Sequence, residues 1–138
     1  MTWVPYALLS ALFAGATAIL AKMGVAAVPS TLATAIRTIV ILLFAWAIVF
    51  ARSEHRALAS IDRRTVMLLV LSGITTGLSW LAYFRALQLA PASKVAPIDK
   101  LSLPLTLVLA WLLLRETLTA KTIVGVALMT VGALLTLR

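Results

Sequence analysis

Five long apolar segments constrain this chain more than any other feature of its sequence. They cover about residues 4–25, 31–50, 66–90, 96–114 and 121–137. Each is about 17–25 residues long, the length at which a helix crosses a hydrocarbon core of roughly 30 Å. Strands of a membrane barrel are shorter and alternate in polarity, which these segments do not. The sequence therefore predicts an all-α integral membrane protein with five transmembrane helices, in a single domain over residues 1–138.

The composition agrees with lipid as the solvent of this chain. Hydrophobic residues make up 63% of it and charged residues 12%, whereas soluble domains average about 45–50% and roughly 25%. A soluble domain of this size has too little interior to bury that much apolar surface. The net charge of +8 is spread over loops and helix ends without a continuous basic face. The expected partner is therefore the lipid bilayer, and not nucleic acid.

The residues that carry most enzyme chemistry are scarce. The chain has no cysteine and one histidine, His55, which lies between arginine-bearing stretches. Disulfides and thiolate catalysis are thereby excluded, and one histidine without an acidic cluster does not build a zinc site. No nucleophile–base pair or cofactor motif occurs. We expect no enzyme activity, no catalytic residue, no metal and no cofactor.

Turn and cap signals separate the five segments. Ser30, Asp62 and Thr119 are predicted N-caps of the second, third and fifth helices. Pro97 suits the first turn of the fourth helix, where its missing N–H costs little. Pro104 lies inside the fourth helix, so a kink is expected there.

The charges of the loops predict the orientation of the chain. The loop of residues 52–64 and the turn between the last two helices carry six basic residues: Arg52, Arg56, Arg63, Arg64, Arg115 and Lys121. The positive-inside rule places both connections, and the N-terminus, on the cytoplasmic side of the inner membrane. The other six fall toward the opposite side: Lys22, Arg37, Arg85, Lys94, Lys100 and Arg138. Dual topology therefore stays open.

Ionisable residues within the spans mark a candidate site, because charge inside a membrane is costly and usually functional. Four helices are expected to bring charge to one depth. The predicted substrate-binding residues are Lys22, Arg37, Tyr83, Arg85, Asp99 and Lys100. The excess of cations favours an anionic or carboxylate ligand. Asp99 is the sole acid within a span, so it is expected to pair with a cation and is the candidate for proton coupling. The alternative is a structural ion pair, with lysines that extend to the interface.

Polar stripes accompany these charges. They comprise Thr31, Thr34 and Thr38, then Ser72, Thr76, Ser79 and Tyr83, then Asp99, Ser102 and Thr106. Facing inward, they would line a cavity; the alternative is that the hydroxyls bond to their own backbone or join helices. Gly73 and Gly77 have the GxxxG spacing that permits close helix contact.

Several of these segments together resemble the EamA family of the drug/metabolite transporter superfamily, in particular its short, single-repeat members. The resemblance rests on residues 15–22 with Pro29 and Arg37, residues 83–92, Asp99 to Ser102, Pro104, and residues 114–118 with Gly125 and Gly132. Arg115 stands where the family commonly has glycine. The resemblance covers nearly the whole chain.

The resemblance implies one five-helix repeat of a small-molecule permease. Family members usually carry two such repeats of inverted orientation and work by alternating access. A chain with one repeat is expected to act as a homodimer or with a partner EamA-type chain. A single orientation conflicts with an inverted homodimer, and a parallel dimer or a related partner would resolve this. The alternatives are a non-transporting membrane subunit or scaffold, and a small multidrug exporter, although the first helix has no acid to bind cations.

Overall fold

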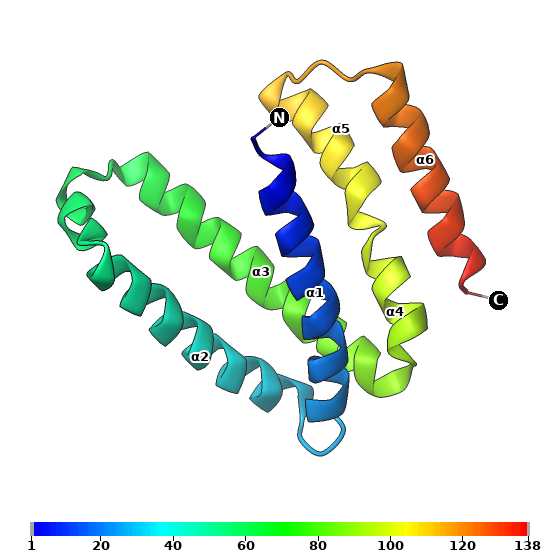
Figure 1. Cartoon of the computed structure of the whole chain (residues 1–138), viewed down its shortest axis with the longest axis horizontal. Coiled ribbons are helices and arrows are strands. Elements are labelled where there is room, and N and C mark those ends of the chain that lie inside the picture. Colours follow the sequence, from blue (N-terminus) through cyan, green and yellow to red (C-terminus); the bar gives the residue numbers. More distant parts are fainter. Residues whose placement is uncertain (1, 138) are drawn as a thin grey trace. The chain divides into compact units, whose positions relative to one another are not determined.

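All regular structure in the computed structural model, which describes residues 2–137, is helical (Figure 1). The elements are α1 (Val4–Gly24), α2 (Ser30–Ala51), the 3₁₀ helix η1 (Glu54–Ser60), α3 (Arg63–Leu89), α4 (Ala92–Asp99), α5 (Ser102–Leu114) and α6 (Ala120–Leu135). The all-α prediction is confirmed. Four segments are long and apolar enough to cross a membrane, with α4 and α5 together forming one of them, and α6 is a shorter apolar helix of 16 residues.

The surface of these helices is apolar. Phe44 is 68% exposed and Leu113 is 74% exposed, and most other large hydrophobic side chains in the spans are exposed as well. The exposure of so much apolar surface to water would be very unfavourable, whereas lipid tails solvate it. The helices thus have the surface of a multi-pass membrane protein.

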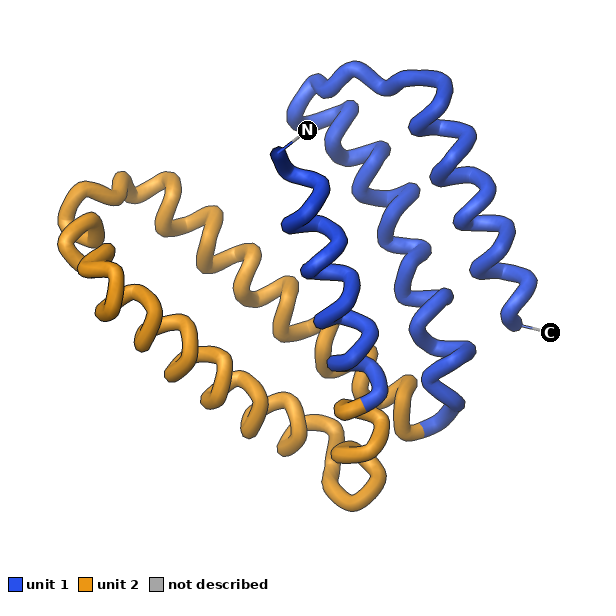
Figure 2. Tube along the Cα trace, viewed as in Figure 1, with its two compact units in different colours: residues 1–19, 89–138 blue, residues 20–88 orange. Residues whose placement is uncertain are grey.

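Two compact units make up the chain (Figure 2). Unit 2 comprises residues 20–88, and unit 1 comprises residues 1–19 and 89–138. In unit 1, α4 and α5 both contact α6. The buried side chains of unit 2 come from the end of α1 and the residue after it, the first turns of α2 and the end of α3: Ala21, Val25, Thr34, Phe84 and Leu87. The core of unit 2 therefore lies at the end of the helices that also carries the predicted cations.

Local cap signals explain where two of the helices begin. The hydroxyl of Thr119 accepts a hydrogen bond from the backbone N–H of Thr122 at 3.2 Å, which caps α6. A carboxylate oxygen of Asp62 accepts one from the backbone N–H of Thr65 at 3.2 Å at the start of α3. Both cap predictions are confirmed. The prediction for Ser30 is wrong: Ser30 is already the first residue of α2, and the extended proline before it occupies the cap position.

The fourth predicted span differs from the prediction. We expected one helix over residues 96–114 with Asp99 and Lys100 in its first turn, but Asp99 ends α4 and Lys100 lies in a break before α5. Pro104 explains the break, because it has no N–H for the carbonyl of Lys100 and its ring clashes with that carbonyl. The carbonyl accepts instead from the N–H of Leu103 at 2.9 Å. Pro97, expected in a first turn, lies inside α4.

The connection between α2 and α3 is more ordered than a plain loop. It turns at Ser53, whose φ of 56° is left-handed, and continues as η1. Helix α3 begins at Arg63, three residues before the predicted start at residue 66, so Arg63 and Arg64 belong to its first turn. Of the cations in this connection, Arg56 thus lies on η1, while Arg63 and Arg64 lie in the first turn of α3.

Candidate functional site

Lys22 joins the end of α1 to the end of α3. Its ammonium group donates a hydrogen bond to the backbone carbonyl of Leu87, in the last turn of α3. The last carbonyls of a helix have no partner within it and carry its negative dipole end, so a cation stabilises them. Lys22 is half-buried, as expected of a span cation that faces protein.

Arg37 lies against two aromatic rings of α3. Its guanidinium carbon is 4.8 Å from the centroid of Trp80 and 4.8 Å from that of Phe84, one helical turn further on. Cation–π contacts of this kind contribute about 0.5–2 kcal/mol, the larger value where water is excluded. Among residues 2–137, no carboxylate forms an ion pair with Arg37. The charge is therefore held by ring faces and stays uncompensated by an acid.

Gln88 is a contact residue that the sequence reasoning missed. Its amide nitrogen donates to the carbonyl of Val25 at 3.0 Å and to that of Val28 at 2.8 Å. Its amide oxygen accepts a hydrogen bond of 3.1 Å from Arg85. Gln88 thus ties the connection between α1 and α2 to the end of α3. Gln88 is the only glutamine of the chain and lies near the end of an apolar helix. Its polar side chain in that position was the only sign in the sequence that it makes a contact.

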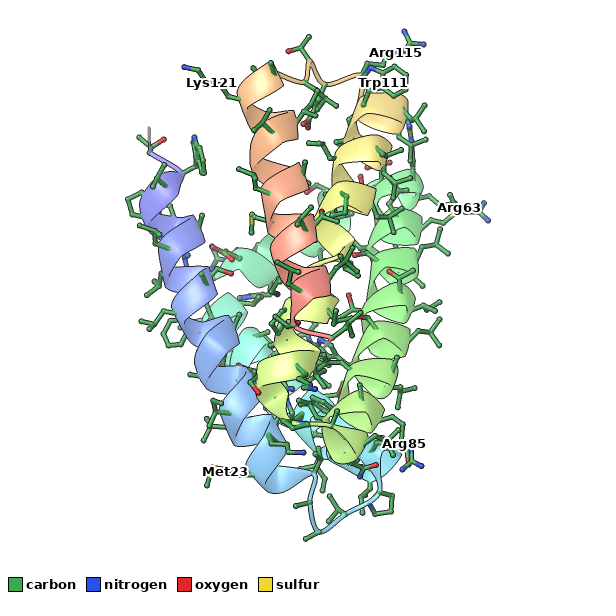
Figure 3. The ribbon with its side chains drawn as sticks, turned by 90° about the vertical axis from the view of Figure 1, so that its right-hand side faces the viewer. Met23, Arg63, Arg85, Trp111, Arg115 and Lys121 are labelled. Carbon is green, nitrogen blue, oxygen red and sulfur yellow. The ribbon has the colours of Figure 1, made fainter. Side chains whose placement is uncertain are left out.

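Arg85 and Tyr83 flank the buried Phe84. Figure 3 shows the side chain of Arg85 projecting away from α3, and Arg85 is exposed. Tyr83 is half-buried, with its ring centroid 6.2 Å from that of Phe84. In unit 2 the structure therefore brings Lys22 and Arg37 against the end of α3, whereas Arg85 is directed outward.

Asp99 and Lys100 belong to unit 1. The ammonium nitrogen of Lys100 lies 3.2 Å from a carboxylate oxygen of Asp99, and both residues are exposed. The prediction that Asp99 pairs with one of the span cations is thus confirmed, and its partner is its neighbour in sequence. The single charged layer over four helices stays a prediction, since three of its members belong to unit 2 and two to unit 1.

Four threonine hydroxyls of the predicted polar stripes bond to their own helices. Thr34 donates to the carbonyl of Ser30 at 2.9 Å, and Thr38 to that of Thr34 at 2.8 Å. Thr76 and Thr106 likewise donate to carbonyls four residues before them, at 2.8 and 2.9 Å. Such bonds satisfy a hydroxyl in lipid without a partner helix or water. These bonds agree with the alternative interpretation of the stripes, in which the hydroxyls bond to their own backbone.

A cavity of about 760 Å³ lies elsewhere in unit 1. It is lined by residues of the turn between α5 and α6 and of the adjoining ends of both helices: Trp111, Leu112, Arg115, Glu116, Thr117, Leu118 and Ile123. None of the predicted site residues lines it. Within the described part of the chain, no group of three or more His, Cys, Asp or Glu is placed to hold a metal ion.

Comparison with known proteins gives the same assignment from two sides. A family described as the EamA-like transporter family matches residues 1–138. A protein of Sinorhizobium sp that carries the name "Uncharacterized transporter in cobO 3'region" is 49% identical over 134 residues, which are 97% of this chain and 95% of that protein. No solved structure matches the chain at a significant level. Both matches are to transporters rather than enzymes. A multi-pass helical membrane chain matched over its whole length in this way belongs to the EamA-like transporter family and is a membrane transporter.

Proposed function

We propose that the chain transports a small metabolite that carries a carboxylate or another anionic group. The observation behind this proposal is the net positive charge of α1, α2 and α3. Near one end, α1, α2 and α3 carry Lys22, Arg37 and Arg85, and none of the three helices contains an aspartate or glutamate. Charges within spans usually mark a substrate or ion pathway. An anionic ligand supplies the negative charge that these helices lack.

In this proposal, six residues line the path of the substrate: Lys22, Arg37, Tyr83, Arg85, Asp99 and Lys100. Asp99 couples transport to protons through its ion pair. Protonation of its carboxylate removes the charge that holds Lys100 at 3.2 Å. The released ammonium group then binds the anion, so that proton and substrate are taken up together.

The proposed assembly is a homodimer, or a pair with a related chain, that works by alternating access between two repeats. Gly73 and Gly77 of α3 support it. A Cβ atom added at either position would meet no heavy atom of the chain within 4 Å. The same holds for the other four glycines, but Gly73 and Gly77 alone have the GxxxG spacing that permits close contact with a helix of another chain.

We also propose that the N-terminus lies in the cytoplasm and that the membrane is the inner membrane, from the arginines of residues 52–64 and the cations that flank the α5–α6 turn. Reporter fusions to each terminus test this orientation. If every copy has one orientation, the inverted homodimer is excluded, and a parallel dimer or a partner chain remains.

The transport proposal is tested with proteoliposomes under an imposed pH gradient, using labelled small mono- and dicarboxylates as probes. Arg37→Ala and Asp99→Asn are expected to lose uptake, since one removes a span cation and the other removes the carboxylate proposed to couple transport to protons. Lys121→Gln, at an exposed position in the first turn of α6, is the matched control and should retain it. Uptake that is unchanged in both site variants contradicts the site assignment.

A second candidate function is a membrane subunit that does not transport by itself. The hydroxyl bonds to the helices' own backbone favour it, because they leave those groups no need of a water-filled cavity. Single cysteines at Thr34, Ser79 and Ser102 discriminate the two, since the chain has no other cysteine. Labelling by a water-soluble alkylating reagent supports the transporter, and no labelling from either side supports the subunit.

A further inference from the structure

We propose that the connection between α2 and α3, residues 52–64, is a binding surface for the headgroups of anionic phospholipids. Its basic residues are all exposed: Arg52, Arg56, Arg63 and Arg64. The proposal concerns the lipid around the chain and is independent of which metabolite is transported.

The two acids of the connection are already engaged. The side chain of Arg52 lies 2.9 Å from the carboxylate of Glu54, with both side chains exposed. Asp62 accepts hydrogen bonds from Thr65 at the start of α3. Among residues 2–137, Arg56, Arg63 and Arg64 form no ion pair. Three guanidinium groups thus remain for an outside anion, and Figure 3 shows that of Arg63 projecting away from its helix.

Apolar side chains accompany these arginines. Leu58 on η1 is 54% exposed and Ile61, directly after it, is 38% exposed. Helix η1 contacts α2, where the rings of His55 and Phe50 lie 5.3 Å apart. Because η1 packs on the end of α2, Leu58 and Ile61 remain exposed to the surroundings of the chain. Cations beside exposed apolar side chains are typical of segments that lie at the boundary of headgroups and acyl chains.

The chemistry of the three arginines selects the ligand. A guanidinium group presents paired N–H donors that match the oxygens of a phosphate. The positive charge favours lipids with a net negative headgroup over zwitterionic ones. Leu58 and Ile61 favour a phosphate carried on a lipid over a free one, because only the lipid brings acyl chains to cover them.

The experiment is native mass spectrometry of the purified full chain in detergent, titrated with phosphatidylglycerol, phosphatidylcholine or inorganic phosphate. The loop variant is Arg56→Gln/Arg63→Gln/Arg64→Gln. The matched control, Lys94→Gln/Arg115→Gln/Lys121→Gln, removes the same charge from other exposed positions. The triple Arg→Lys variant of the loop keeps the charge, and circular dichroism confirms that each variant is folded.

We expect the wild-type chain and the control to bind phosphatidylglycerol in preference to both other probes. The loop variant should bind it roughly ten- to a hundredfold more weakly. The Arg→Lys variant should bind with an affinity between those of the wild type and the loop variant, because it keeps the charge but loses the paired N–H donors. Equal binding of the two lipids by the wild type, or an equal loss in the loop variant and the control, overturns the proposal. Competition by inorganic phosphate at the same concentration also overturns it, because the site would then be one for a free anion.

Discussion

The guanidinium carbon of Arg37 lies 4.8 Å from the centroid of the Trp80 ring, so a cation of α2 is held by an aromatic face of α3. Phe84 offers a second face at the same distance. Ring faces attract a cation without neutralising it, unlike a carboxylate. Arg37 is therefore held in place while its charge remains for a ligand, which is what the proposed anion site needs.

The first prediction concerns this contact. Trp80→Leu should lower stability, and a double-mutant cycle with Arg37→Gln should give a coupling free energy of about 0.5–2 kcal/mol. Unfolding in mild detergent measures it. Trp111→Leu is the control, because Trp111 is 57% exposed and makes no cation–π contact in the described residues. A coupling of zero would show that the two side chains do not interact in the folded protein.

The second prediction concerns Gln88. Gln88→Leu leaves the carbonyls of Val25 and Val28 without their donor, which should cost about 1–3 kcal/mol where they are shielded from water. Exchange of the backbone amide protons of residues 25–28 should become faster. Thr75→Ala on the same helix removes only a bond to its own backbone and should leave that exchange unchanged. Equal exchange in the Gln88 variant and the wild type would contradict the role of Gln88 as a tie.

The third prediction concerns the break between α4 and α5. Pro104→Ala restores an N–H that can donate to the carbonyl of Lys100, so the two helices should join into one. We expect slower transport with unchanged or higher stability, because the break adjoins the ion pair of Asp99 and Lys100. Proteoliposome uptake and thermal unfolding measure the two effects. Pro97→Ala, which leaves Pro104 in place, should retain the break. Unchanged uptake in Pro104→Ala would argue against a role for the break in transport.

The fourth prediction concerns Arg115, which ends α5 with a left-handed φ of 55°. A residue with a Cβ is disfavoured there by about 1–2 kcal/mol, whereas glycine adopts this conformation freely. Arg115→Gly should therefore raise the free energy of unfolding by about 1 kcal/mol. Arg115→Ala removes the same charge but keeps the Cβ atom, so it should give no such gain. Similar stability of the two variants would assign any effect to charge.

The fifth prediction concerns pH. Hydrogen bonds from the side chain and backbone of Thr65 hold the pKa of the Asp62 carboxyl below its usual value of 3.8. A carboxyl whose pKa is lower in the folded state stabilises the fold above its unfolded pKa, and this contribution is lost as the pH falls through the folded pKa. In thermal unfolding, the wild type should therefore be more stable than Asp62→Ala. The difference in stability should be constant near neutral pH and should shrink in acid.

Asp62→Asn serves as the control for this titration. It keeps an acceptor for the cap but has no proton to take up in this range. Its stability relative to Asp62→Ala should not change between neutral and acid pH. A wild-type margin that stays constant down to the lowest pH at which the protein is folded would contradict the role of the carboxylate charge.

The features predicted correctly from the sequence are set by residues close together in the chain. The spans follow from runs of apolar residues, and the caps at Asp62 and Thr119 depend on a partner three residues away. The break at Lys100 was expected in kind, because Pro104 acts on the carbonyl four residues before it. The start of α4 at Ala92 was not predicted, because its first turn is polar and either of two prolines could mark the helix start. Pro91 serves as the cap and Pro97 is accommodated inside the helix.

The contacts of the site could not be predicted from the sequence, because they join residues that are far apart in the chain. Arg37 meets Trp80, and Gln88 meets Val28, across separations of about 40 to 60 residues. Which rings and carbonyls face each other depends on how helices rotate and pack, and local propensity does not specify that. The sequence therefore identified the cations of the spans but not the neutral groups that hold them.

Helix α6 has a consequence for the membrane itself. Its 16 residues rise about 24 Å, roughly 6 Å less than an average hydrocarbon core. Such hydrophobic mismatch is relieved when the bilayer thins locally or when helices associate, at fractions of a kcal/mol per Å. We expect the lipid beside α6 to be thinner than the surrounding bilayer. Membranes with a thin hydrocarbon core should therefore accommodate α6 at a lower elastic cost than thick ones.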